Sequence, residues 1–289
     1  MGRGRVLRYA TMEPKVWIDG ALVPRSEATI DVYDLSLLRG YGIYEGLAAH
    51  DGEPFRFRDH WERFGRSAKA LDLAIPYTGE EVLAAMRALV KENAPHGRAI
   101  IRMILTGGNA DGGIVHVAGR EQLYLLSEPM RPYPIEWYER GAHAITHAHR
   151  RAFPEFKTID YTVAVMLQSK MKQAGAAEAV YISDGNVLEC TGSNIFCVRN
   201  SALVTPKDEM LHGITRNVTL ELAREAGLTI EERALPLEEL LAANEVFITS
   251  SFKDIVPLRS IDDTLITAPG PISKDLMARF LKYAETFRN

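Results

Sequence analysis

The stretch that decides the fold is AFPEFKTIDYTVAV, residues 152–165, which contains a single lysine, Lys157. Aromatic and aliphatic side chains lie on both sides of this lysine. A buried ammonium group is costly unless it is paired or neutral. A lone lysine usually lays its stem along apolar surface and reaches water with its tip. The other interpretation is an amine with a lowered pKa that attacks a carbonyl and forms a Schiff base.

Length and composition limit what the chain can be. It has 289 residues, 46% hydrophobic and 25% charged, with a net charge of −4. These values are typical of a globular protein of one large or two medium domains, and they favour neither a nucleic-acid partner nor a membrane surface. The two cysteines, Cys190 and Cys197, cannot form a disulfide framework, so we expect a reducing compartment, the cytoplasm. The basic start has no apolar signal segment, and residues 1–12 are expected to be a frayed extension.

Strand and helix patterns are mixed without strict alternation, which favours an α+β fold. Asp-Gly pairs at 19–20, 51–52 and 184–185 separate apolar runs and predict hairpins. Three prolines within 127–137 predict a linker at 130–136, between a smaller N-terminal domain at 13–129 and a larger C-terminal domain at 137–289. Apolar residues at helical spacing predict helices, the first with Asp59 as its N-cap, within 58–75, 79–94, 161–176, 215–227 and 273–287.

A second informative stretch is NVLECTGSNIF, residues 186–196. Glu189 falls on a strand that otherwise reads apolar, and a carboxylate there could simply face solvent. A pyridinium nitrogen, however, needs a carboxylate partner if a pyridoxal ring is to act as an electron sink. Residues 191–194 follow at once and offer hydroxyl and backbone N–H groups.

A third stretch, HGITRNVTLEL at 212–222, places a glycine and a hydroxyl residue at the start of a helix. Free N–H groups at such a start, with the positive helix end behind them, bind phosphate. Gly213, Ile214 and Thr215 are the candidates. A capped helix without a ligand is the alternative.

Together these residues resemble the class IV aminotransferases, the pyridoxal-phosphate enzymes of the branched-chain and D-amino-acid transaminase fold. The resemblance covers nearly the whole chain, because the lysine, the glutamate and the phosphate nest occur in the family's order. It implies a two-domain, fold type IV enzyme with pyridoxal 5'-phosphate in an active site at the domain interface. It also implies a homodimer, with pocket residues from the neighbouring subunit. No metal site is expected, since the eight histidines form no ligand-spaced cluster.

The resemblance also assigns roles to the cofactor-binding residues. Lys157 is the expected Schiff-base lysine, and its freed amine would move a proton between the substrate Cα and the cofactor. Glu189 is expected to keep the pyridine nitrogen protonated. Tyr161 would bind the phenolic oxygen, with core packing as the alternative. The remaining cofactor contacts are expected from Arg63, for which solvated surface is the alternative, and from Ser193, Asn194, Gly213, Ile214, Thr215, Ser250 and Ser251.

The substrate must be argued from the pocket. A guanidinium matches the carboxylate that amino acids and 2-oxo acids share. The resemblance places Arg102 at the pocket and brings Arg39 there from the neighbouring subunit, and both are expected to hold substrate carboxylates. Branched-chain transaminases usually place a tyrosine two residues before the Arg102 position, where this chain has Ile100. Further substrate contacts are expected from Tyr44, Ser251 and Phe252.

The loop at 106–119 lacks the Arg-x-His pair that well-known D-amino-acid transaminases carry. The chain is therefore most similar to a divergent D-amino-acid transaminase group. We expect it to move the amino group of D-alanine or D-glutamate to 2-oxoglutarate or pyruvate. Three alternatives stay open: a branched-chain L-amino-acid transaminase, an aminodeoxychorismate lyase, and a catalytically silent binding protein on the same scaffold.

Overall fold

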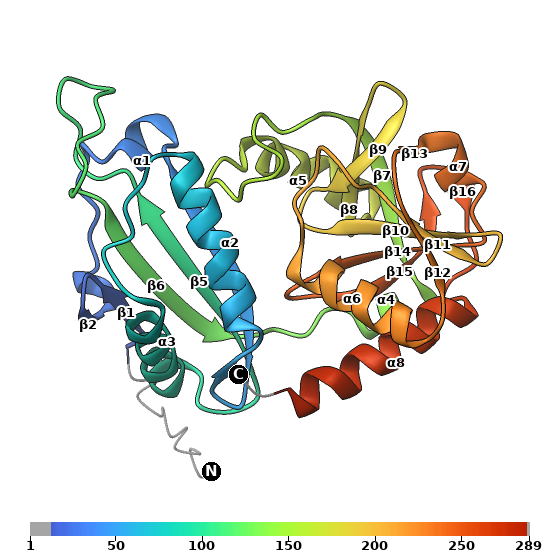
Figure 1. Cartoon of the computed structure of the whole chain (residues 1–289), viewed down its shortest axis with the longest axis horizontal. Helices are drawn as coiled ribbons and strands as arrows, with labels where there is room; N and C mark the ends of the chain where they lie inside the picture. The colour runs from blue at the N-terminus through green and yellow to red at the C-terminus, as the bar shows by residue number, and fades with distance from the viewer. Residues whose placement is uncertain (1–12, 288–289) are drawn as a thin grey trace, which may run out of the picture.

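The structure, a computed structural model that describes residues 13–287, is built around two β-sheets (Figure 1). Helices pack on both sheets, which confirms the predicted α+β class. Among the described residues, no helix has the length and apolar content to cross a membrane. The extension predicted for residues 1–12 lies outside the described residues.

The first sheet has six strands in the order β2-β1-β6-β5-β3-β4, and every neighbouring pair is antiparallel. The predicted hairpins at Asp19-Gly20 and Asp51-Gly52 are confirmed, and both residues of each pair have positive φ, as type I′ turns require. The strands are β1 (Lys15–Ile18), β2 (Ala21–Pro24), β3 (Gly42–His50), β4 (Glu53–Pro54), β5 (Arg98–Thr106) and β6 (Gln122–Pro129), joined in part by η1 (Arg25–Glu27) and α1 (Leu35–Arg39).

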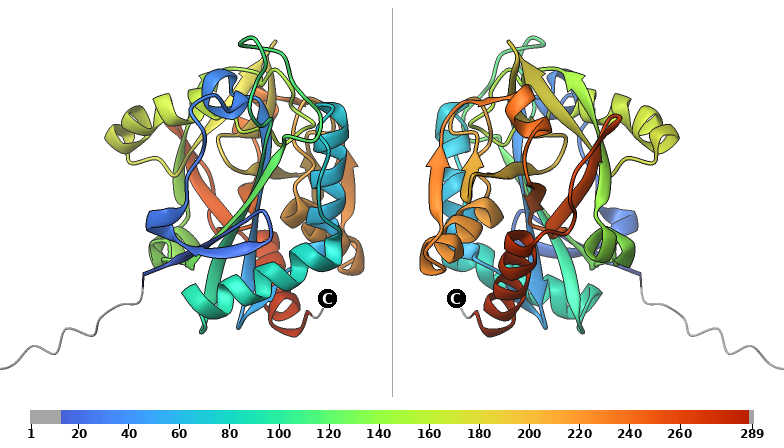
Figure 2. Two further views of the ribbon diagram at one scale, coloured as in Figure 1. Left: turned by 90° about the vertical axis from the view of Figure 1, so that its left-hand side faces the viewer. Right: turned by 90° about the vertical axis from the view of Figure 1, so that its right-hand side faces the viewer.

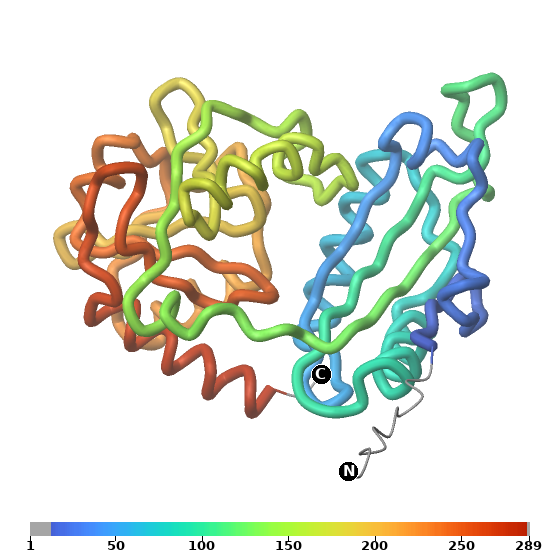
Figure 3. The backbone as a smooth tube through the Cα atoms, turned by 180° about the vertical axis from the view of Figure 1, so that it is seen from behind, coloured from blue at the N-terminus to red at the C-terminus, as the bar shows by residue number. Residues whose placement is uncertain are grey.

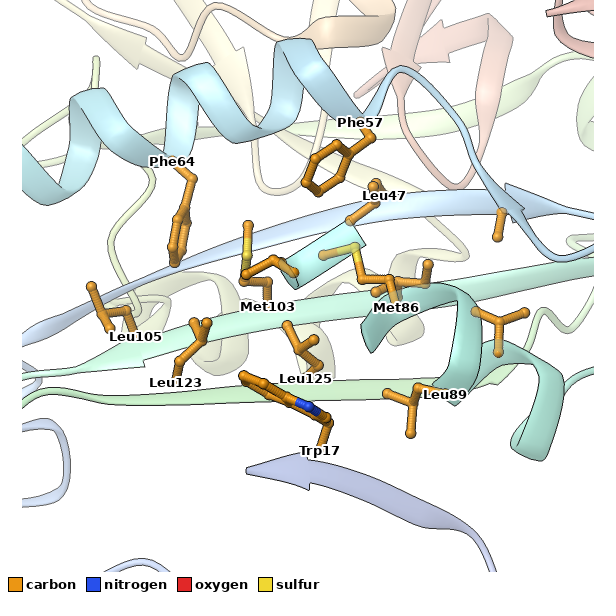
Figure 4. Close-up of a cluster of buried hydrophobic side chains, with 14 of the residues drawn as sticks. Trp17, Leu47, Phe57, Phe64, Met86, Leu89, Met103, Leu105, Leu123 and Leu125 are labelled. Atoms are coloured by element: carbon orange, nitrogen blue, oxygen red, sulfur yellow. The ribbon is translucent and has the colours of Figure 1, made fainter. Parts of the chain in front are cut away.

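Two helices, α2 (Phe57–Ala70) and α3 (Gly79–Asn93), cover one face of this sheet. Their apolar sides meet alternate strand residues such as Leu47 and Met103 in one buried cluster (Figure 4). Each fully buried side chain of this size contributes about 1.5–3 kcal/mol through burial. The opposite sheet face carries Tyr44 and is left to line the site.

The predicted N-cap of α2 is wrong, because Asp59 lies inside the first turn and the helix begins at Phe57. Arg56 precedes the helix with a left-handed φ of 52°, and its guanidinium contacts Asp59 at 3.3 Å. The Asp59 carboxylate therefore sits near the positive helix end without capping it. The α3 start follows the expected rule, since Thr78 and Glu81 form a capping box.

The second sheet contains the remaining strands, in the order β12-β11-β10-β14-β15-β7-β8-β9-β13, with β16 paired to β15. Three of its pairings are parallel: β11 with β12, β15 with β7, and β7 with β8. The predicted hairpin at Asp184-Gly185 is confirmed between β8 and β9. The strands are β7 (Ala142–Ala148), β8 (Glu178–Ser183), β9 (Asn186–Cys190), β10 (Asn194–Arg199), β11 (Ala202–Thr205), β12 (Thr229–Glu232), β13 (Leu235–Pro236), β14 (Glu245–Ser250), β15 (Asp254–Ile261) and β16 (Thr264–Leu265).

The chain passes from the first sheet to the second after β6 in one extended stretch, which Figure 3 shows from behind. The last helix, α8 (Pro271–Thr286), lies at the base of the molecule (Figure 2), runs back toward the first half (Figure 1) and packs Phe280 and Tyr283 against Phe55. The two halves are thus joined by the linker and by this aromatic contact. The helices of the second half are α4 (Ile135–Arg140), α5 (Thr162–Ala174), α6 (Ile214–Glu225), α7 (Leu237–Leu241) and α8 (Pro271–Thr286).

Candidate active site between the two sheets

One cavity lies where the two sheets face each other, and it gathers most of the predicted site residues. The first sheet and α2 contribute residues from one side, and the second sheet and its loops contribute the rest. The residues predicted from sequence that line it are Tyr44, Arg63, Lys157, Tyr161, Glu189, Ser193, Asn194, Gly213, Ile214, Thr215, Ser250, Ser251 and Phe252.

The backbone of the Lys157 segment is fixed by hydrogen bonds to β3 of the first sheet. The Lys157 carbonyl accepts a hydrogen bond from Tyr44 N at 2.9 Å, and Ile159 N donates to the Gly42 carbonyl at 3.1 Å. Lys157 N also donates to the Ser67 hydroxyl at 3.2 Å. The apolar residues around the lysine thus serve an interface between the two halves, and its side chain projects into the cavity.

Two tyrosines surround the Lys157 amine. Lys157 Nζ donates to Tyr161 Oη at 3.1 Å and lies 4.4 Å from the centre of the Tyr44 ring. Burial lowers the pKa of Lys157, but Tyr161, Tyr44 and Glu45 outweigh burial and raise that pKa above its usual value. The expectation of a lowered pKa is therefore wrong for this arrangement of side chains. Burial raises the pKa of Tyr44 to about 12.

Glu189 is buried and tied to an arginine that the sequence analysis missed. Arg151 Nε donates to Glu189 Oε1 at 2.6 Å, and Leu211 N donates to Oε2 at 3.0 Å. The same guanidinium donates to the carbonyls of Pro154 and Phe156 in the Lys157 segment. Arg151 therefore links the carboxylate to the backbone that carries the lysine.

The predicted phosphate nest has the geometry that an anion needs. Helix α6 begins at Ile214 without any side-chain cap, so N–H groups of its first turn are left for a ligand. A Cβ at Gly213 would overlap the Asn194 Oδ1 atom, so only glycine allows this close approach. Thr249 Oγ1 also lines the cavity, buried and without a hydrogen-bond partner among residues 13–287. A carboxylate near one part of this wall and free N–H donors at another fit a pyridoxal phosphate.

Arg63 is buried rather than solvated, with 4% of its surface exposed. Its Nε and Nη2 atoms donate to the two Glu45 oxygens at 3.0 and 2.7 Å, and its Nη1 donates to the His212 carbonyl at 2.9 Å. Burial would raise the pKa of Glu45, but Arg63 and His60 hold it at about 2. Glu45 thus remains charged and fixes the Arg63 guanidinium beside the start of α6.

The contacts of Glu45 with Arg63 and His60 lead us to predict that the protein loses stability in acid. The Glu45 pKa falls from 4.5 in the unfolded chain to about 2. A depressed pKa stabilises the fold above pH 4.5, and this contribution, on the order of 3 kcal/mol, is lost as the pH falls toward 2. We expect Glu45→Gln to lower the unfolding free energy at pH 7 by about this amount, and the difference from wild type to shrink in acid. Urea unfolding at several pH values measures it, with exposed Glu139→Gln as the control. A difference that does not change with pH would contradict the assignment.

Arg39 and Arg102 do not line this cavity. Arg39 lies at the end of α1, where its Nη1 donates to the Leu38 carbonyl. Arg102 of β5 is opposite Gly46 of β3, on the face of the first sheet that is turned toward the cavity. Its guanidinium, however, contacts Glu128 at 2.5 Å. Their roles in carboxylate binding therefore stay predictions.

Four charged residues at or behind the cavity were missed by sequence reasoning: Glu45, Arg151, Glu178 and Lys253. Glu45 interrupts an apolar strand pattern, which is the same signal that identified Glu189, whereas Glu178 is the first residue of its strand and carries no such signal. Arg151 and Lys253 lie in irregular segments, where no periodicity marks an inward side chain. Among the residues that the structure describes, no group of histidine, cysteine and carboxylate side chains is gathered as a metal ion would require.

Comparisons with known proteins agree with this geometry. The profile of the family described as amino-transferase class IV matches residues 42–261. A putative branched-chain-amino-acid aminotransferase of Methanocaldococcus jannaschii is 35% identical over 277 residues, 92% of this chain and 95% of the relative. A D-alanine aminotransferase of Bacillus licheniformis is 32% identical over 268 residues, 91% and 94% of the two chains. The crystal structure of a branched-chain aminotransferase from Thermoproteus uzoniensis with norvaline has a TM-score of 0.85 at 30% identity, covering 94% of each chain.

Proposed function

This chain belongs to the class IV aminotransferases, which use pyridoxal 5'-phosphate, and from that premise we propose that it acts on D-amino acids. The donor is of the D-alanine or D-glutamate type, and the acceptor is a 2-oxo acid such as 2-oxoglutarate or pyruvate. The bound cofactor supplies an electron sink for the negative charge left when the substrate Cα loses its proton. The side chains around the cavity bind and orient the cofactor and the substrate and move the proton.

The observation that supports a preference for D-amino acids is the isoleucine at position 100. It lies on β5 opposite Ala48 of β3, on the sheet face that also carries Tyr44 and Arg102. Branched-chain transaminases usually place a tyrosine here, whereas Ile100 offers only an alkyl group and, like Arg102, is not among the residues that line the cavity. A substrate carboxylate therefore finds no hydroxyl at this position, and the cationic groups elsewhere must hold it.

We assign the proton transfer to Lys157, because it is the amine that enters the cavity beside Tyr161. Tyr161 Oη accepts a hydrogen bond from Lys157 Nζ and keeps this amine oriented. Glu189 would bind the ring nitrogen of the cofactor, and Arg151 holds the Glu189 carboxylate in place through its Nε atom. Arg63, together with the N–H groups of Ile214 and Thr215, would hold the phosphate, and the hydroxyls of Ser250 and Ser251 would complete that wall.

A branched-chain L-amino-acid transaminase is the second candidate. It is supported by the identity of this chain to the Methanocaldococcus jannaschii relative and by its likeness to the Thermoproteus uzoniensis structure. The two candidates differ in which side of the cavity holds the substrate carboxylate, because exchanging D for L swaps the positions of carboxylate and side chain.

A substrate panel separates these candidates. We expect D-alanine and D-glutamate to be converted with a kcat/KM at least about 100-fold above that of their L forms, since a misplaced carboxylate leaves charged groups unpaired. The measurement is the rate of 2-oxo acid formation from D and L forms of alanine, glutamate and leucine. Turnover of L-leucine alone would contradict the D preference and establish the second candidate.

The same preparation tests the two remaining alternatives, a lyase and a catalytically silent scaffold. Release of 4-aminobenzoate from aminodeoxychorismate would indicate a lyase. A protein that stays colourless after addition of pyridoxal phosphate would indicate a silent scaffold, whereas we expect a yellow protein that loses its colour when reduced with borohydride.

We further propose that the protein is a cytoplasmic homodimer in which Arg39 of one subunit reaches the cavity of the other. Apolar side chains near α1 and α5 support this, because Leu37, Val165 and Met166 are 59%, 68% and 73% exposed in the single chain. The two free cysteines, both buried thiols, fit a reducing compartment. Light scattering of the purified protein measures the mass; a monomer that retains full activity would exclude a role for Arg39 across the interface.

A further inference from the structure

Lys253 is a partly buried cation that lines the cavity, and the roles assigned above do not use it. It lies in the turn between β14 and β15, and only 14% of its side chain is exposed. Its backbone is fixed from both sides, because Lys253 N donates to the Ser250 hydroxyl at 3.2 Å and the Tyr138 hydroxyl donates to the Lys253 carbonyl at 3.1 Å. These bonds fix the backbone of the turn, and the Nζ atom lies 5.7 Å from the centre of the ring of Tyr133, another residue that lines the cavity.

The other cations that line the cavity already have roles in the assignment given above. Arg63 donates hydrogen bonds to both carboxylate oxygens of Glu45 and to the His212 carbonyl. Arg151 donates hydrogen bonds to Glu189 and to backbone carbonyls. Lys157 is the reacting amine. Lys253 makes one hydrogen bond among the described residues, to Glu178, although an ammonium group has three donors.

Glu178, the carboxylate that pairs with Lys253, also accepts hydrogen bonds from three other donors. This carboxylate, 1% exposed, accepts from Lys253 Nζ at 2.6 Å, from the Ser193 hydroxyl at 2.7 Å, from Gly192 N at 3.1 Å and from the Thr191 hydroxyl. Its negative charge is shared among four donors and lies behind the cavity wall. Burial lowers the pKa of Lys253, but Glu178 outweighs burial and raises it, so the amine stays protonated.

We propose that Lys253 binds the α-carboxylate of the amino acid and of the 2-oxo acid, as the specificity-determining cation within the subunit. The proposal rests on the proposed function, since both substrates of a transaminase carry this carboxylate. A cation matches a carboxylate, and the contact with Glu178 uses one of the three ammonium donors, which leaves two without a hydrogen-bond partner among the described residues. Arg102, in contrast, is engaged by Glu128 outside the cavity lining.

The test compares substrates that differ only in the carboxylate. Isopropylamine is alanine with a methyl group in place of the carboxylate, so the ratio of the two KM values isolates carboxylate recognition. Propionate, an unreactive carboxylate, is titrated into the yellow holoenzyme, and its Kd is read from the cofactor absorbance. The variants are Lys253→Met, Lys253→Arg and Arg102→Leu, with exposed Lys274→Met as the matched control.

We expect Lys253→Met to raise the KM for alanine and the Kd for propionate by about 10- to 100-fold, the usual effect of losing a charge-assisted hydrogen bond. Isopropylamine turnover stays within a few-fold of wild type, Lys253→Arg recovers most of the binding, and Lys274→Met behaves as wild type. Equal losses for alanine and isopropylamine would overturn the proposal, as would a loss confined to glutamate or one produced by Arg102→Leu instead.

The outcome is independent of the D preference. If the wild-type enzyme converts only L-leucine, the proposed function fails, and the comparison is made between L-leucine and 3-methylbutylamine, which is leucine without its carboxylate. A loss for L-leucine alone in Lys253→Met then still supports the role of Lys253.

Discussion

Replacing Lys157 with alanine lowers the rate of amino-group transfer by about 10³-fold or more, because no other amine occupies its place between Tyr44 and Tyr161. Single-turnover absorbance measurements with D-alanine follow the loss directly. The same change at Lys170, an exposed residue on α5, leaves the rate unaltered and serves as the control.

The position of the covalent link provides the second half of this experiment. Borohydride reduction of the wild-type holoenzyme, followed by mass spectrometry of its peptides, is expected to place the cofactor on the peptide that contains Lys157. The Lys157→Ala protein is expected to bind the cofactor without a covalent link, since Glu189, Arg63 and the α6 start remain. Attachment to another lysine, or an unchanged rate in the variant, would contradict the assignment.

The sequence allowed these assignments because each carries a local signal. Lys157 and Glu189 break apolar patterns, and the Gly-Ile-Thr stretch before a helix marks an anion site within three residues. The hairpins at Asp-Gly pairs are equally local, because two positive φ angles require such residues. The fold class and the main contents of the cavity were therefore within reach of sequence reasoning.

What could not be predicted are pairings between segments that lie far apart in the chain. Glu178, at the start of β8, meets Lys253 in the turn between β14 and β15, and Glu45 of β3 fixes Arg63 of α2 beside the cavity. The sequence shows each residue, but the free energy of burying it depends on the partner that the fold brings to it. The prediction of a lowered pKa for Lys157 was wrong because Tyr161, four residues along the chain, and Tyr44, which the fold brings from the first sheet, both raise this pKa.

Replacing Glu189 with glutamine is expected to lower the rate of transfer by about 10²- to 10³-fold, the usual effect of removing one preorganised electrostatic group. The amide keeps the shape of the side chain but no longer carries a negative charge for the ring nitrogen. The variant is also expected to unfold more easily, by about 3 kcal/mol, because Arg151 loses its partner at 2.6 Å and remains buried. Urea unfolding and single-turnover rates measure the two effects, with exposed Glu139→Gln as the control.

A double-mutant cycle with Arg151→Met separates the two effects of Glu189. Removing both charges leaves no unpaired ion, so the double variant is expected to be more stable than Glu189→Gln alone. The rate behaves differently if Glu189 acts on the cofactor itself: its replacement then costs the same factor whether or not Arg151 is present. If the cost in rate disappears in the Arg151→Met background, Glu189 acts only by balancing Arg151, and the ring nitrogen must find its partner elsewhere on the cavity wall.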